Sequence, residues 1–139
     1  MRRTLQLRDG KATVADIEAS RATITLTNNG NVSDNTWFGY RESIPSNTTP
    51  IVIPWDSTLV EVSFSNNRTS VDGNVEFYLN GTAPGDIFRT WNFTNVNLVQ
   101  ILDGIADPFT AGDRLALQWD DQGQNPRDAV ITLFFILDS

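Results

Sequence analysis

The chain has 139 residues and a formal net charge of −7, with 10 basic and 17 acidic side chains. This length is enough for one domain with a hydrophobic core of its own. Cysteine and histidine are both absent, which excludes disulfides, thiolate metal sites, cysteine nucleophiles, the Ser-His-Asp triad and nearly every zinc site.

The charge is unevenly distributed along the chain. Residues 1–21 hold five basic and three acidic side chains, a charge of +2, whereas the other 118 residues hold five basic and fourteen acidic ones, a charge of −9. Binding to nucleic acid depends on Lys and Arg contacts to phosphates. We therefore expect an acidic protein with no nucleic-acid partner.

The amino-terminal segment, residues 1–21, is polar and lacks strand alternation. We expect an extended arm that becomes ordered on a partner. Its candidate contacts are its basic side chains, Arg2, Arg3, Arg8 and Lys11. No apolar run follows the first arginines, so the sequence predicts neither a signal peptide nor a transmembrane segment. We expect synthesis in a host cytoplasm and no membrane partner.

Alternating apolar and polar residues predict a series of short β-strands after the arm. The first is expected over residues 22–27, before a turn at residues 28–31. Prolines on both sides place the strand at residues 51–55 at a sheet edge. The remaining strands are expected at residues 36–41, 58–65, 74–80, 87–93 and 98–102, around Leu115, Leu117 and Trp119, and at residues 129–137.

Two strands, residues 58–65 and 74–80, have the clearest alternation. The polar segment between them predicts that they form an antiparallel pair. Their expected inward side chains are Val60, Val62 and Phe64 in the first strand and Val75, Phe77 and Leu79 in the second.

The last strand, residues 129–137, is apolar on both faces and is expected to close a hairpin with the strand before it. A strand of this kind needs cover on both sides. The core supplies one cover, and no amphipathic helix is predicted that would supply the other. We therefore expect one face to meet a neighbouring subunit, with the candidate interface residues Ile131, Leu133, Phe134, Phe135 and Leu137.

Eight or nine short strands at roughly ten-residue spacing, without a convincing helix, predict an all-β antiparallel sandwich. Loops of unequal length favour a jelly roll of about eight strands over an up-and-down barrel. The predicted organisation is an arm at residues 1–21 and one jelly-roll domain at residues 22–139.

A pattern of elements over residues 36–137 resembles small virion proteins of tailed bacteriophages. It comprises an apolar strand, a polar loop and a strand ending in Asn-Gly within residues 51–81, then an Ala-Gly-Asp corner and a further strand at residues 109–119. It is also similar to trimeric jelly rolls of the tumour-necrosis-factor and complement C1q type.

The resemblance implies a non-enzymatic structural protein without a cofactor. Its implied form is a homotrimer on the virion, which binds the major capsid protein as a capsid decoration (cement) protein. The alternative is a receptor-binding or glycan-binding jelly-roll domain of a phage fibre.

Two groups of acidic residues have alternative interpretations. Glu61 and Glu76 lie on the polar faces of strands expected to be neighbours, as glycosidase carboxylates would, but solvent-exposed acids on an open sheet explain them as well. Asp120, Asp121 and Asp128 flank the loop before the last strand. They could gather calcium, although their spacing matches no calcium loop and a solvated acidic turn is the alternative.

Three aromatic residues are candidates for stacking on sugar rings: Trp37, Tyr40 and Trp55. Aromatic side chains also build hydrophobic cores, so core packing is the alternative for each of them.

Overall fold

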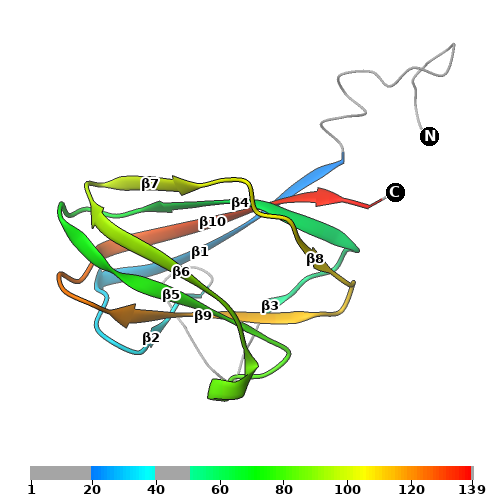
Figure 1. Cartoon of the computed structure of the whole chain (residues 1–139), viewed down its shortest axis with the longest axis horizontal. Coiled ribbons are helices and arrows are strands. Elements are labelled where there is room, and N and C mark those ends of the chain that lie inside the picture. Colours follow the sequence, from blue (N-terminus) through cyan, green and yellow to red (C-terminus); the bar gives the residue numbers. More distant parts are fainter. Residues whose placement is uncertain (1–19, 40–50, 139) are drawn as a thin grey trace, which may run out of the picture.

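The computed structural model describes residues 20–39 and 51–138, which form two antiparallel sheets packed face to face (Figure 1). The predicted all-β sandwich is therefore confirmed. The candidate capsid contacts Arg2, Arg3, Arg8 and Lys11 lie outside the described residues, as does Tyr40.

Each sheet has five strands. Sheet A has the order β1-β10-β4-β7 with β8 also paired to β4, and sheet B has the order β2-β9-β5-β6 with β3 also paired to β9. The only helical element among the described residues is one 3-10 turn, Pro84–Asp86. The strands are β1 Arg21–Asn31, β2 Thr36–Trp37, β3 Ile51–Val52, β4 Ser57–Ser65, β5 Val71–Leu79, β6 Ile87–Val96, β7 Val99–Leu102, β8 Asp107–Phe109, β9 Arg114–Asp121 and β10 Arg127–Leu137.

The two pairings predicted between successive strands are wrong. β4 pairs with β10, β7 and β8, whereas β5 pairs with β6 and β9, so the chain changes sheets between β4 and β5. It changes sheets again between β9 and β10. The physical reason is that each of these strands buries an apolar face, and placing them in different sheets lets those faces meet across one core.

A β-bulge changes which residues of β4 face inward. Phe134 pairs with Glu61 but Phe135 pairs with Leu59, so β4 has one extra residue at this point. Leu59 is consequently buried, and Val60 is displaced from the inward face that alternation predicted. An inserted residue reverses the parity of every position beyond it.

β10 lies inside sheet A, between β1 and β4 (Figure 1). Its core-facing side chains are at most 1 % exposed and comprise Ala129, Ile131, Leu133 and Phe135. Three candidate interface residues, Ile131, Leu133 and Phe135, are thus corrected to core residues of a single chain. The strand does have two apolar faces, but this one is covered from within by sheet B.

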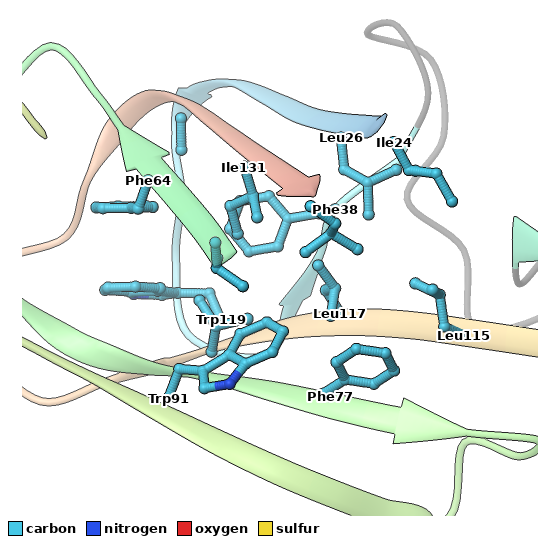
Figure 2. Close-up of a cluster of buried hydrophobic side chains, with 14 of the residues drawn as sticks. Ile24, Leu26, Phe38, Phe64, Phe77, Trp91, Leu115, Leu117, Trp119 and Ile131 are labelled. Carbon is cyan, nitrogen blue, oxygen red and sulfur yellow. The ribbon is translucent and has the colours of Figure 1, made fainter. Parts of the chain in front are cut away.

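The centre of the core joins the two sheets through aromatic rings. Trp119 of sheet B is fully buried and stacks on Phe64 of sheet A, with ring centroids 5.7 Å apart and planes 7° apart. Figure 2 shows side chains of both sheets pointing toward one another in this region. The indole lies over the backbone of Gly73, where a Cβ atom would overlap the ring.

A second link joins the sheets at the edge that carries β6 and β8. The Arg89 guanidinium donates hydrogen bonds to both carboxylate oxygens of Asp107, the shortest from Nη2 to Oδ1 at 2.8 Å. Asp107 is only 5 % exposed. A carboxylate buried this far needs a charged or hydrogen-bonding partner, so the ion pair fixes β8 against β6.

We predict that Gly73→Ala destabilises the fold by about 1–3 kcal/mol, because the added methyl group forces the Trp119 ring out of its stacking position. Urea unfolding monitored by tryptophan fluorescence measures the change. The control is Gly85→Ala, since nothing lies within 4 Å of a Cβ at Gly85. Equal stability of Gly73→Ala and the control would contradict the close approach of Trp119.

Candidate functional site

The outer face of sheet A carries the second apolar face of β10. Val130 and Phe134 are partly exposed there, and Ile136 is 40 % exposed. The register sets Phe134 beside Glu61 of β4, and Val130 beside Ser65. Of the five candidate interface residues, Phe134 alone lies on this face with its ring accessible, whereas Leu137 is half-buried at the end of the strand.

Exposed apolar side chains of the described residues gather on this sheet. Val99 and Ile101 of β7 are 55 % and 56 % exposed, and Leu98, just before β7, is 48 % exposed. With Ile136 they make four of the five exposed large apolar residues, and the fifth, Val52, lies on sheet B. Ser63 and Ser65 separate the β7 and β10 side chains.

Leu98 has an unusual backbone conformation, with φ at +70°. Its N–H donates to the Arg68 carbonyl at 3.0 Å, and its carbonyl accepts from the Asn66 N–H at 2.8 Å. A bulky residue in the left-handed region costs on the order of 1–3 kcal/mol and persists only where its surroundings enforce it. Here the enforced conformation presents an apolar side chain to solvent.

We define the assembly face as Val99, Ile101, Val130, Phe134 and Ile136. Four cross-strand rows run over this sheet: Thr23–Phe134–Glu61, Thr25–Thr132–Ser63–Ile101, Thr27–Val130–Ser65–Val99 and Arg21–Ile136–Thr58–Pro108. Glu61 and Arg21 are the two ionisable side chains in these rows of described residues. Apolar and hydroxyl side chains with little charge suit contact with another protein surface.

The outer face of sheet B has a different chemistry. Two rows of side chains cross it: Trp37–Gln118–Glu76–Thr90 and Asp120–Asn74–Asn92. Neither row contains a lysine or arginine. We define the polar face as Trp37, Asn74, Glu76, Asn92, Gln118 and Asp120.

Hydrogen bonds hold the polar face together. The Asn92 amide donates to Asn74 Oδ1 at 2.7 Å, and the Asn74 amide donates to Asp120 Oδ2 at 3.1 Å. The Tyr78 hydroxyl donates to Gln118 Oε1 at 3.0 Å, and its ring contacts Trp37 with centroids 5.0 Å apart. The side chains are therefore fixed by one another.

On the polar face, the carboxyl group of Glu76 has a raised pKa. Burial raises its pKa above the ordinary value of 4.5, and the neighbouring carboxylate of Asp120 raises it further, while a hydrogen bond from Tyr78 acts in the opposite direction. Burial and the charge of Glu76 also raise the pKa of Tyr78. Burial is the largest cause of both pKa shifts, and the neighbouring carboxylates add to it.

Glu61 and Glu76 do not converge. Glu61 lies on the outer face of sheet A and Glu76 on the outer face of sheet B, so the core separates them. The prediction that they sit on neighbouring strands is wrong, because it depended on the hairpin between β4 and β5. A pair of glycosidase carboxylates must flank one bond, which these two cannot do.

The three aspartates near the last loop have separate partners. Asp128 Oδ1 accepts from the Gly30 N–H at 2.7 Å, and Asp121 Oδ1 accepts from the Gly123 N–H at 3.2 Å. Asp120 accepts from Asn74 and Gln122. No group of three or more acidic side chains in residues 20–39 and 51–138 is arranged to hold a metal ion.

The two candidate aromatics within the described residues have different positions. Trp55 packs against core residue Phe135 with ring centroids 6.2 Å apart, so core packing explains it. Trp37 alternates with buried Phe38 and faces outward over Tyr78. The sequence predicted Trp37 as a candidate but not Asn74, Asn92 or Gln118, whose only signal in the sequence is that they alternate with buried residues.

The chain matches no protein-family model and no curated protein. None of the helical structure in the described residues is long and apolar enough to cross a membrane.

We predict that Glu76→Gln stabilises the protein at pH 7. A raised pKa means that the folded state holds its proton more tightly than the unfolded state, so stability falls as pH rises from about 4.5 through the folded pKa. The glutamine removes this loss and keeps an acceptor for Tyr78. Thermal unfolding from pH 3 to pH 8 should show a gain at neutral pH that vanishes at about pH 3. A gain that persists at pH 3 would contradict this origin.

Proposed function

We propose that the protein is a non-enzymatic structural subunit of a phage virion. In this proposal it forms a homotrimer through the assembly face and decorates the capsid by binding the major capsid protein. The observation that carries the proposal is the concentration of exposed apolar side chains on the outer face of sheet A, with Leu98 exposed just before β7.

The strand pairing supports a jelly roll as the finer fold. Six antiparallel pairings join β1 to β10, β2 and β3 to β9, β4 to β7 and β8, and β5 to β6. The strands from β1 to β5 thus pair, in reverse order, with the strands from β10 to β6, which is the pairing expected of a jelly roll. Jelly rolls are frequent in viral capsid and lectin domains, but fold alone does not fix function.

Charge also favours the assembly face as the contact between copies. The body outside residues 1–21 carries −9, so identical subunits repel each other over most surfaces. The four rows of the assembly face contain one carboxylate, Glu61, and one cation, Arg21. Contact through this face therefore brings fewer like charges together than contact through the polar face.

We predict that the pure protein has a mass of three times 15.5 kDa in light scattering at micromolar concentration. Val99→Ser combined with Ile101→Ser should shift the mass toward the monomer, because both side chains lose apolar area in the interface. The control is Val52→Ser, since Val52 is as exposed as Val99 at 55 %. A wild-type monomer, or equal dissociation by the control, would refute assembly through sheet A.

We predict that removing residues 1–19 leaves the trimer intact and abolishes binding to phage particles. These residues precede β1, and they carry Arg2, Arg3, Arg8 and Lys11 as charges for a partner. Co-sedimentation with particles lacking the protein measures binding. Unchanged binding by the truncated trimer would reject the arm's role, and labelling of fibre tips in place of the capsid would reject decoration.

A further inference from the structure

The polar face of sheet B carries a connected set of hydrogen-bonding side chains. Asn92, Asn74 and Asp120 form a chain of bonds across β6, β5 and β9. Gln118 is held at both ends, since its amide donates to the Asn35 carbonyl at 3.0 Å while its Oε1 accepts from Tyr78. Their rotamers are therefore fixed before any ligand arrives, which lowers the entropic cost of binding.

The same side chains keep unused hydrogen-bonding capacity. A side-chain amide can donate two hydrogen bonds and accept two. In the bonds described, Asn74 and Asn92 each donate one and accept one. Glu76 accepts one bond of 3.4 Å from Tyr78, although a carboxylate accepts about four. The polar face therefore offers amide donors next to amide and carboxylate acceptors. A sugar hydroxyl group can use both, because it donates one hydrogen bond and also accepts them.

Trp37 adds an apolar surface at one end of the row Trp37–Gln118–Glu76–Thr90. Its ring lies against Tyr78, and its carbonyl accepts from the Asn28 amide at 3.0 Å, so the strand that carries it is held in place. Adjacent strands are about 4.8 Å apart, so the row from Trp37 to Thr90 over four strands is about 14 Å long. A surface of this length suits several linked sugar rings better than a single one.

Charge decides which class of glycan fits. Glu76 and Asp120 are close enough to influence each other, and neither row contains a cation. A sulfated or sialylated chain would place further negative charge beside these carboxylates. We propose that the polar face is a binding site for a neutral oligosaccharide, in which Trp37 stacks on a sugar ring and Asn74, Asn92 and Glu76 bind hydroxyl groups.

The test uses the full-length ¹⁵N-labelled protein and neutral hexasaccharides of glucose, mannose and xylose, with sialyllactose and a heparin hexasaccharide as charged probes. At about 10 mM, a range that detects millimolar dissociation constants, at least one neutral chain should shift the Trp37 indole and the Asn74 and Asn92 amide signals. The charged probes should not shift them. No response to any neutral chain, or an equal response to the charged ones, would overturn the proposal.

Two variants and a control locate the site. Asn92→Ala should weaken binding of the responding hexasaccharide about threefold to tenfold, as expected for a lost hydrogen bond. Trp37→Ala should weaken it at least as much. The control Asn29→Ala removes an exposed asparagine from β1 of sheet A and should leave affinity unchanged. Equal loss in the control would place binding elsewhere.

A peptide of residues 1–19 tests the competing occupant, since its basic side chains complement the carboxylates. Shifts of the same signals by this peptide, without a response to neutral sugars, would assign the face to the arm and overturn the proposal.

Discussion

The structure depends on one close contact, the Trp119 indole lying across the backbone of Gly73. A side chain at Gly73 would fill the space of the ring, so the largest core side chain and the smallest residue are required together. The indole then reaches Phe64 and joins the sheets. Its Nε1 is buried without a partner among the described residues, a cost of about 1–3 kcal/mol that packing must offset. Stacking, not hydrogen bonding, therefore orients this ring.

The core uses only the inward side chains of the two sheets, so the outward side chains of sheet A and sheet B can have different chemistry. The inward side of β10 is buried in the sandwich, so its outward side, with Val130, Phe134 and Ile136, is the part left accessible. On sheet B the outward amides, carboxylates and hydroxyl groups hydrogen-bond to one another, and two aromatic rings are in contact. We infer a division of roles, in which sheet A serves assembly and sheet B serves recognition of a hydroxyl-rich ligand.

Local alternation predicted much of the fold. It placed Val62, Phe64 and Phe77 inward, as the structure does, because burial on one face imposes a period of two. It failed where structure depends on distant residues. The bulge that buries Leu59 in place of Val60 arises from pairing with β10, and the partners of β4 are set by sheet packing. The polar face could not be foreseen for the same reason, since Asn74 and Asp120 meet only through the register of β5 and β9.

The central claim is that sheet A is covered between copies of the chain while sheet B is not. Hydroxyl-radical footprinting, compared between dilute and concentrated protein, tests it at the level of side chains. We predict that oxidation of Phe134 and Ile101 falls as the assembly forms, whereas oxidation of Trp37 does not change. Constant labelling of Phe134 and Ile101 at every concentration, or protection of Trp37 in their place, would contradict the account.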